Sequence, residues 1–280
     1  MFSTSIIELD RAALRHNLRF LRKQLGPDCT LCSVIKGNAY GHGIDEFVPL
    51  AEDAGVDHFA VFSAAEALRV VSARRRGADV TIMGSADSAE LKWAIGHDVA
   101  FWVFDLARLE LARDLARQVG RPARVHLELE TGMFRTGLEE CTLERVAEIL
   151  RDAGMHVQVD GVCTHFAGAE SVANYLRIRQ QQERFEALTT RLAELGVTWR
   201  RRHTACSAAA LTYPETTMDL ARIGIAQFGY WPSRETRMHY QTRAGTHAVN
   251  PLRPVLTWKS RIMAVKSVPA GQFVGYGTSY

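Results

Sequence analysis

The sequence contains no run of apolar residues approaching the roughly 20 that a membrane-spanning helix needs, and its start, MFSTSIIELD, lacks the features of a secretory leader. Its five cysteines are scattered and only Cys29 and Cys32 form a CxxC motif, so no disulfide framework or metal site is indicated, and a redox role is the alternative left for that pair. The formal net charge is only +3 at pH 7, which does not indicate nucleic-acid binding. We therefore expect a cytoplasmic protein with neither a membrane nor a nucleic acid as partner.

Short apolar runs alternate along the chain with amphipathic helical patterns. The runs begin near residues 31, 57, 79, 99, 124, 157, 199 and 220. Helix-start signals precede several helical patterns, including Asp10, Asp105 and the capping-box sequence from Ser63 to Glu66. The seventh run, WRRHTA, is polar, and we retain it because it completes the count. Eight such units predict an α/β fold, a TIM-type (β/α)8 barrel over residues 1–240.

The pattern changes after about residue 240. Residues 251–260 are rich in Leu, Val, Thr and Trp, residues 261–266 form another strand candidate, and Pro269-Ala270-Gly271 is typical of a turn. A β domain needs several strands to be stable. We therefore expect residues 241–280 to be the beginning of a β-rich C-terminal domain that is incomplete at residue 280.

The segment VIKGNAYGHG, residues 34–43, places Lys36 at the end of an apolar strand, at the barrel face where active sites are built. We expect desolvation there to lower the lysine pKa and make its amine nucleophilic. Glycines allow the backbone to approach a ligand, and the Tyr40 hydroxyl is a donor suited to phosphate. The pattern alone is equally compatible with a surface lysine followed by a turn.

The loops after the seventh and eighth predicted strands indicate a phosphate site, because phosphate often binds between these two loops in TIM barrels. In HTACSAAAL, residues 203–211, Ser207 is placed as an N-cap of an alanine-rich helix. In ARIGIAQFG, residues 221–229, Gly224 and Ile225 can present backbone N–H groups. A simple helix cap and a turn glycine are the alternatives for Ser207 and Gly224.

Taken together, these motifs resemble the alanine racemase family. VIKGNAYGHG is similar to the cofactor-lysine signature of that family, and further matches follow in order: ETGMFRTG at 130–137, THFAGAE at 164–170, HTACSAAAL, ARIGIAQFG and VGYGTSY at 274–280. The resemblance covers essentially the whole chain. It implies a barrel that binds pyridoxal 5′-phosphate, a following β domain, a head-to-tail homodimer, and racemisation of an amino acid, with alanine as the expected substrate.

The resemblance also implies residue roles. Lys36 would be the Schiff-base lysine, and Tyr276 the second catalytic acid/base, given to the partner subunit's site. The cofactor would further contact these side chains and backbone groups: Tyr40, Ser207, Gly224 and Ile225 at the phosphate, Arg222 with His203 behind it at the pyridine nitrogen, and His165 near the ring. Arg135 would bind the phenolic oxygen and the substrate carboxylate. Because an arginine does not readily give up a proton, Arg222 would keep the ring nitrogen unprotonated and limit side reactions.

One departure concerns Glu128. Many alanine racemases carry a carbamylated lysine at this position, which is in effect a long carboxylate. We interpret Glu128 as a built-in anion that orients Arg135 through a charge-assisted pair, with a packing or solvent-facing role as the alternative.

Three alternatives stay open at the level of sequence. The first is a non-catalytic barrel that carries pyridoxal phosphate, although VGYGTSY argues against it. The second is a racemase of serine or of other amino acids. The third is a decarboxylase of the same fold, which would require a carboxylate rather than Arg222 at the ring nitrogen.

Overall fold

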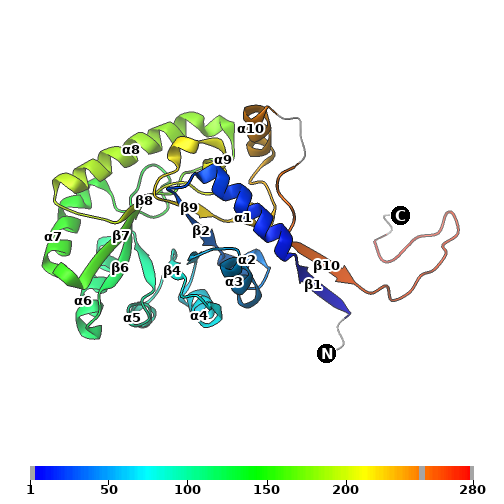
Figure 1. Ribbon diagram of the computed structural model, residues 1–280, viewed down its shortest axis with the longest axis horizontal. Helices are drawn as coiled ribbons and strands as arrows, with labels where there is room; N and C mark the ends of the chain where they lie inside the picture. The colour runs from blue at the N-terminus through cyan, green and yellow to red at the C-terminus, as the bar shows by residue number, and fades with distance from the viewer. Residues whose placement is uncertain (1–3, 246–249, 278–280) are drawn as a thin grey trace.

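The computed structural model describes residues 4–245 and 250–277, and its main body is a barrel of eight parallel strands (Figure 1). The strands follow the order β8-β7-β6-β5-β4-β3-β2-β9. Their bounds are β2 Thr30–Val34, β3 His58–Val61, β4 Asp79–Ile82, β5 Ala100–Val103, β6 Ala123–Glu128, β7 Val157–Cys163, β8 Arg201–His203 and β9 Leu220–Ile223. All eight runs expected from the sequence are strands, so the predicted (β/α)8 barrel is confirmed.

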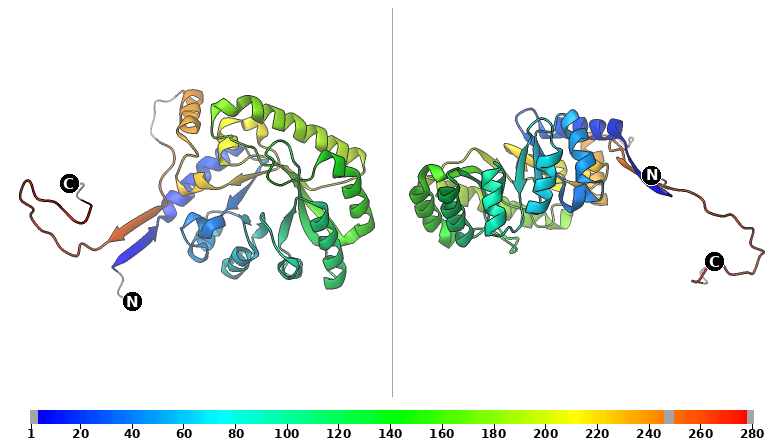
Figure 2. Two further views of the ribbon diagram at one scale, coloured as in Figure 1. Left: turned by 180° about the vertical axis from the view of Figure 1, so that it is seen from behind. Right: turned by 90° about the horizontal axis from the view of Figure 1, so that it is seen from below.

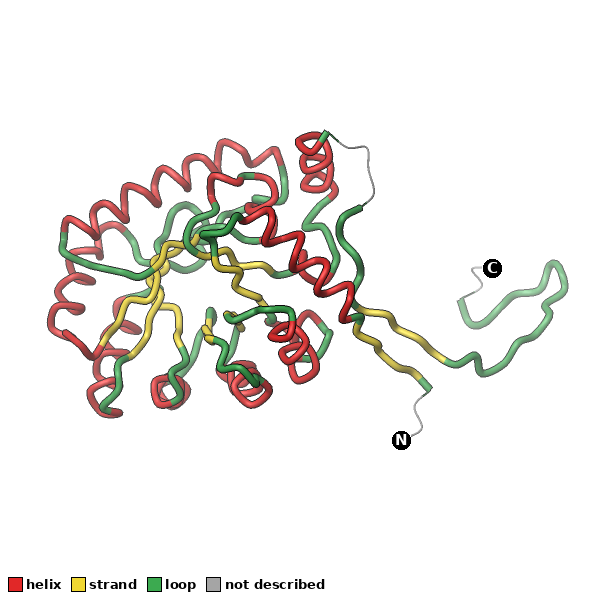
Figure 3. Tube along the Cα trace, in the orientation of Figure 1, coloured by secondary structure: helices red, strands yellow, loops and turns green. Residues whose placement is uncertain are grey.

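Helices surround the sheet on its outer side, as the tube view shows (Figure 3). They are α1 Arg11–Leu25, α2 Lys36–Tyr40, α3 Ile44–Asp53, α4 Ala64–Ala73, α5 Ser88–Gly96, α6 Leu106–Val119, α7 Leu143–Ala153, α8 Tyr175–Glu194, α9 Ser207–Thr212 and α10 Arg234–Ala244. Short 3-10 turns lie at Glu140–Thr142, Gly154–His156, Val172–Asn174, Pro214–Thr216 and Ile225–Phe228.

The helix-start signals act largely as the sequence predicts. Asp10 accepts hydrogen bonds from the backbone N–H groups of Ala12 and Ala13, and the Asp105 side chain caps α6. At α4 only half of the expected capping box forms, because Ser63 accepts from the Glu66 N–H while the Glu66 carboxylate binds other backbone groups. Each cap satisfies a backbone donor that would otherwise lack an intrahelical partner.

The barrel closes at its weakest strand. β8 is only three residues long, and in the described chain one isolated bridge, Cys206 with Arg222, joins the segment after β8 to β9. Two backbone hydrogen bonds complete this junction, from Arg222 N to Ala205 O at 2.9 Å and from Asp219 N to Arg202 O at 3.1 Å. The last two strands therefore meet beside the loops in which the sequence predicts a phosphate site.

A two-stranded arm extends away from the barrel (Figure 2). β1, Ser5–Leu9, pairs antiparallel with β10, Leu256–Ser260, and residues 261–277 continue beyond it. The strand expected at 261–266 is wrong, because these residues have no regular structure; within the described chain the pairing ends at the hydrogen bond from Arg261 N to Thr4 O at 2.9 Å. The predicted turn is confirmed by the hydrogen bond from Gln272 N to Pro269 O, whereas β1 was missed.

The arm contrasts with the barrel in burial. The barrel core contains fully enclosed aromatic side chains such as Phe59, Phe101 and Phe185, whereas Trp258 on the arm is 75% exposed and Met263, in the segment beyond it, is 98% exposed. Helix α10 runs across residue 240, and the division into domains 1–240 and 241–280 stays a prediction. No helix in the described ranges is both long and apolar enough to span a bilayer.

Candidate active site

Lys36 lies two residues after the end of β2 and begins a turn of unusual handedness. The next four residues, Gly37 to Tyr40, have φ values between 53° and 63°, so the chain runs through a left-handed helical turn that only glycine adopts without strain. Lys36 itself is exposed, and the enclosure expected from its position after an apolar strand is not found, because the turn lifts it out of the sheet. The turn presents Lys36 and Tyr40 at the carboxyl-end mouth of the barrel.

Polar contacts hold this left-handed turn in place. The N–H of Asn38 donates to the Glu66 carboxylate at 3.0 Å, and the Asn38 side-chain oxygen accepts from Arg69 at 2.7 Å. On the other side, Nδ1 of the buried His42 lies 2.9 Å from the Ala39 carbonyl and donates to it. These contacts offset a backbone conformation that costs of the order of 1 kcal/mol for each non-glycine residue.

Ser207, Gly224 and Tyr40 meet at one point of this mouth. The Gly224 N–H donates to Ser207 Oγ at 2.9 Å, and a Cβ added to Gly224 would lie 2.5 Å from the Tyr40 hydroxyl oxygen. Burial raises the pKa of Tyr40, so its phenol keeps the proton that it can donate. Ser207 is the first residue of α9 rather than its N-cap, a position that Cys206 takes, so its hydroxyl is directed to Gly224 instead. Ile225 follows at the start of a 3-10 turn.

Arg222, on β9, is the most heavily bonded cation of the mouth. Only 4% of it is exposed, and its Nη2 donates to the carbonyls of Thr164 at 2.7 Å and Thr204 at 3.1 Å. Its Nη1 lies 2.6 Å from His203 Nδ1, and its guanidinium carbon lies 5.2 Å from the centre of the Trp102 ring. Hydrogen bonds at both terminal nitrogens and the Trp102 ring therefore hold the guanidinium in one orientation.

Two buried histidines continue inward from Arg222. Because a guanidinium has no acceptor, His203 Nδ1 must accept from it, so the proton of His203 sits on Nε2. That Nε2 lies 2.8 Å from Nδ1 of His126, which accepts in turn. Burial lowers the pKa of His126 to about 4 and that of His203 well below its ordinary value, with the Arg222 charge adding to the effect on His203. Both rings are therefore uncharged near neutral pH.

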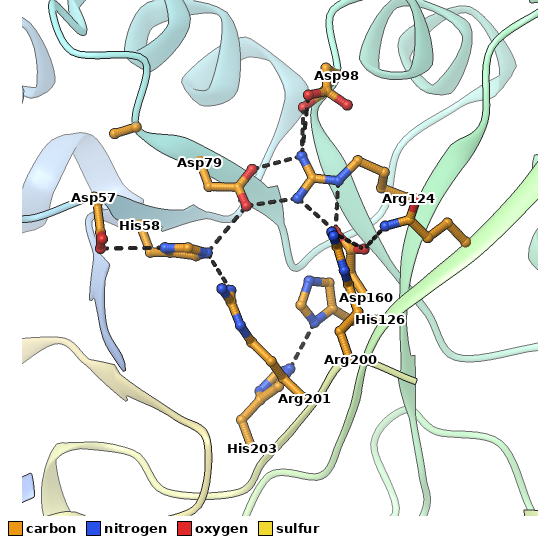
Figure 4. Close-up of polar contacts among 12 residues, drawn as sticks. Asp57, His58, Asp79, Asp98, Arg124, His126, Asp160, Arg200, Arg201 and His203 are labelled. Atoms are coloured by element: carbon orange, nitrogen blue, oxygen red, sulfur yellow. Dashed lines mark hydrogen bonds and ion pairs between the residues drawn. The ribbon is translucent and has the colours of Figure 1, made fainter. Parts of the chain in front are cut away.

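A cluster of charged side chains adjoins this pair at the amino ends of the strands (Figure 4). Arg124 binds both carboxylate oxygens of Asp79, at 2.8 and 2.7 Å, and donates to Asp160 at 2.6 Å. His58 lies 3.1 Å from the same Asp79. Burial alone would raise the pKa of Asp79, but hydrogen bonds from His58 and Arg124 outweigh it and hold the pKa below its ordinary value. The amino-end face of such barrels generally serves stability.

Glu128 is the last residue of β6 and Arg135 lies in the loop that follows it; the sequence interpretation pairs the two directly. Glu128 is buried, but its hydrogen-bond partner is the Thr136 hydroxyl, at 2.7 Å, and the ion pairs of the described residues include none between Glu128 and Arg135. Burial raises the pKa of Glu128, while the Thr136 hydroxyl and the Arg135 charge oppose that rise. Arg135 itself is exposed. Its influence on Glu128 is thus electrostatic rather than a direct contact.

His165 lies at the end of β7, 3.4 Å from Arg222 Nη2 through its Nδ1. Burial, with the charge of Arg222 next in weight, lowers the pKa of His165 to about 3, so its ring is neutral. Tyr276 is not brought to this mouth: it is fully exposed and belongs to the segment that extends beyond the arm (Figure 2). The CxxC pair is not oxidised, and burial raises the pKa of Cys29 to about 11 and of Cys32 to about 12, which disfavours the reactive thiolates.

Sequence reasoning missed several residues that support the site. His126 and Trp102 lie on the inner side of β6 and β5, where a strand pattern gives no sign that they contact residues 77 or more positions away. The carbonyl of Thr164 was missed for the same reason. The described part of the protein is thus a parallel α/β barrel with an accessible amine, a small polar cradle and a buried cation at the carboxyl ends of its strands, the arrangement of a barrel enzyme.

Comparison with known proteins defines the family. A family model described as "Alanine racemase, N-terminal domain" matches residues 9–232. Alanine racemase of Desulforamulus reducens is 36% identical over 280 residues, covering 98% of this chain and 71% of that protein, and alanine racemase of Leptospira interrogans is 33% identical, covering 99% and 69%. The solved alanine racemase from D-cycloserine-producing Streptomyces lavendulae is 33% identical with a TM-score of 0.88, covering 100% of this chain and 71% of that one. The chain belongs to the alanine racemase family.

Proposed function

We propose that this protein interconverts L- and D-alanine with pyridoxal 5′-phosphate held on Lys36. The observation that carries the proposal is the convergence, at one mouth, of Lys36, the Tyr40–Ser207–Gly224 cradle and the buried Arg222. Relatives that are similar in both sequence and structure bear the name alanine racemase. The catalytic assignment of each residue and the cofactor are parts of the proposal.

The residues fit that cofactor. Because position 224 has no side chain, the Tyr40 hydroxyl can lie directly against its backbone, so hydroxyl and backbone donors are close enough to face one phosphate together. Tyr40 and Ser207 would donate hydroxyl protons to it, and the Gly224 and Ile225 N–H groups would contribute further donors. Arg222, which has donors only and keeps its charge, would face the ring nitrogen and leave it unprotonated, while the uncharged His165 would lie near the ring.

When bound, the cofactor supplies an electron sink that stabilises negative charge at the substrate Cα. Lys36 would hold it through Nζ and, once released, would move the Cα proton on one face of the substrate. Tyr276 Oη of a second copy would hold the proton on the opposite face, since within its own chain this residue lies far outside the mouth. Arg135 would bind the substrate carboxylate, with Glu128 supplying the nearby negative charge that orients it.

A head-to-tail homodimer is part of this proposal. The arm and the segment beyond it expose large apolar side chains, among them Trp258, Met263 and Phe273, and surfaces of this kind mark sites of protein association. The second candidate function is a barrel that binds the cofactor without racemising an amino acid. It is favoured by one observation, the complete exposure of Tyr276 on the extended segment.

Proton exchange at Cα tests the proposal. The protein is incubated with pyridoxal phosphate and L-alanine in D₂O, the α-proton is followed by NMR, a chiral assay detects D-alanine, and Lys36→Ala is the control. We expect exchange together with D-alanine in the wild type and neither in the variant. Exchange without D-alanine would mean that Tyr276 does not complete the site. Absence of exchange, with borohydride still fixing the cofactor on Lys36, would favour the carrier, and absence of any attachment to Lys36 would refute the proposal.

A further inference from the structure

Gln227 uses every hydrogen-bonding group of its side chain to join two strand ends. It is fully buried, and its Nε2 donates to the carbonyls of Val34 at 2.9 Å and Ile223 at 3.0 Å. Its Oε1 accepts from the Ser33 hydroxyl at 2.6 Å. One amide thus bridges the last residues of β2 and the last residue of β9. These are the strands that lead directly into Lys36 and into Gly224.

Gln181, on α8, makes the equivalent bridge across the mouth. It is 1% exposed, its Oε1 accepts from Ala167 N at 2.9 Å, and its Nε2 donates to the His165 carbonyl and to Thr131 Oγ1, both at 3.2 Å. This amide therefore links the loop after β7, which carries His165, to the loop after β6, which carries Arg135.

The donor order in this second bridge is fully determined. Thr164 Oγ1 donates to the Leu129 carbonyl at 2.9 Å, so the 2.7 Å contact between Thr131 Oγ1 and Thr164 Oγ1 takes its proton from Thr131. Thr131 is then free to accept from Gln181. The same Thr164 offers its backbone carbonyl to Arg222 at 2.7 Å, so the chain that begins at Gln181 ends at the cation of the site.

Simple filling of the core does not account for these two amides. Space filling alone would need only an apolar side chain of the same size. Such a side chain would leave buried partners of the amide, for example the Ala167 N–H, unpaired, and buried polar groups are tolerated only when they are paired. Here every amide group is paired, and each pairs with the strand or loop that precedes a residue of the site. A fully satisfied buried network fixes one relative position of the segments that it joins.

We infer that Gln227 and Gln181 are positioning residues with separate tasks. Gln227 sets the distance between Lys36 and the Gly224 cradle, and so governs how tightly the cofactor is held. Gln181 fixes the position of the loop that carries Thr164 and His165 relative to the loop that carries Arg135. It therefore governs how the substrate is bound and how fast it is turned over. The inference rests on the proposed function, since it assigns each bridge to one part of that site.

The test compares Gln227→Met with Gln181→Met, using Gln182→Met, the neighbouring residue on α8, as the matched control. Pyridoxal phosphate affinity is measured by titration, and kcat and KM for alanine are measured at saturating cofactor. Because a misplacement of about 1 Å can cost about 100-fold, we expect Gln227→Met to weaken cofactor affinity at least about ten-fold. We expect Gln181→Met to leave that affinity within about three-fold while kcat/KM falls at least about ten-fold, and Gln182→Met to change neither.

Two milder variants keep the test decisive if a methionine variant does not fold. Ser33→Ala removes one bond of the first bridge, and Thr131→Val removes the bonds of Thr131 to Gln181 and to Thr164 in the second. Each variant should show the same pattern of effects as its glutamine variant, at smaller size. Hydrogen exchange of the Ala167 amide in cofactor-free protein, expected to speed up in Gln181→Met alone, reports the bridge without any activity. Equal losses of affinity and turnover in both variants, or no loss in either, would overturn the inference. A wild type that neither binds cofactor nor racemises alanine would instead refute the proposed function, and the exchange measurement would still stand.

Discussion

Arg222 and His203 form a buried pair in which the arginine can only donate and the histidine can only accept, with Nη1 and Nδ1 separated by 2.6 Å. A proton on His203 Nδ1 would place two donors face to face beside a full positive charge. The same restriction passes to His126, because its Nδ1 accepts from His203. The orientation of Arg222 thus depends on two rings staying neutral, and this dependence has a consequence for stability.

Acidification should destabilise the protein from about pH 6.5 downward. A histidine whose pKa is about 6.5 when unfolded and about 4 when folded binds more protons in the unfolded state throughout that window, so the free energy of unfolding falls as the pH falls. We expect His126→Asn, which keeps an acceptor for His203, to show a shallower loss than the wild type between pH 7.5 and 4.5. The difference should reach about 2 kcal/mol at pH 4.5.

Urea unfolding at several pH values measures this. His97→Gln is the control, since His97 is exposed and lies outside the pair, and its pH dependence should match that of the wild type. Identical slopes for His126→Asn and wild type would show that the buried pair does not set the acid limit.

Replacing Arg124 should destabilise the barrel more than replacing a surface arginine. Arg124→Met would leave the carboxylates of Asp79 and Asp160 in a largely buried place without their shared cation, which costs about 3–5 kcal/mol. Arg145→Ala, which removes only exposed ion pairs, should leave the free energy of unfolding within error. Thermal and chemical unfolding measure the loss of stability in both variants. Equal losses would mean that the Arg124 cluster contributes no more to stability than an exposed ion pair does.

Gly224→Ala should weaken cofactor binding without unfolding the protein. The added methyl would lie 2.5 Å from the Tyr40 hydroxyl oxygen and would push it out of the cradle. A loss of at least about ten-fold in pyridoxal phosphate affinity, equivalent to about 1.4 kcal/mol, is expected in a fluorescence titration. Gly96→Ala, whose added Cβ meets nothing within 4 Å, is the matched control and should bind as the wild type does. Unchanged affinity in Gly224→Ala would place the phosphate elsewhere.

Glu128→Gln should impair the handling of alanine but not the fold. The amide keeps an oxygen that can accept from the Thr136 hydroxyl and removes only the charge, so the loop is retained while Arg135 loses its nearby anion. We expect KM for alanine to rise or kcat to fall by about ten-fold, equivalent to about 1.4 kcal/mol. Steady-state kinetics with and without bicarbonate provide the check. Activity of the wild type that depends on bicarbonate would argue against Glu128 as the built-in anion.

The sequence predicts most of the barrel because strand hydropathy and helix caps are local signals. The exception is β8, Arg201–His203, which hydropathy does not indicate and which we predicted only because an eighth strand was needed. Its side chains Arg201 and His203 contact His58 and His126 rather than an apolar core. The prediction of a strand at 261–266 was wrong because a strand also needs a neighbouring strand to bond with, which a local pattern of apolar residues does not guarantee. β1 was missed because its partner lies about 250 residues away in the chain.

The candidate site was predicted in part. The short motifs place Lys36, Ser207 and Gly224 correctly at the mouth, since each follows a strand. The enclosure of Lys36 was wrong, because a left-handed turn is not encoded by hydropathy. The bridging glutamines were also invisible, because a polar residue in a helix is ordinarily a solvent-facing one, and only the fold shows that both are enclosed.

The pairing of β1 with β10 joins Ser5 to Ser260. On a ribosome that adds about 5–20 residues each second, β1 is exposed for roughly 10–50 s before its partner has been made. During that interval Ile6 and Ile7 form an unpaired edge, so the barrel is expected to fold first and the ribbon to close last. The order of synthesis therefore makes β1 one of the last strands to pair, although it is made before the barrel strands.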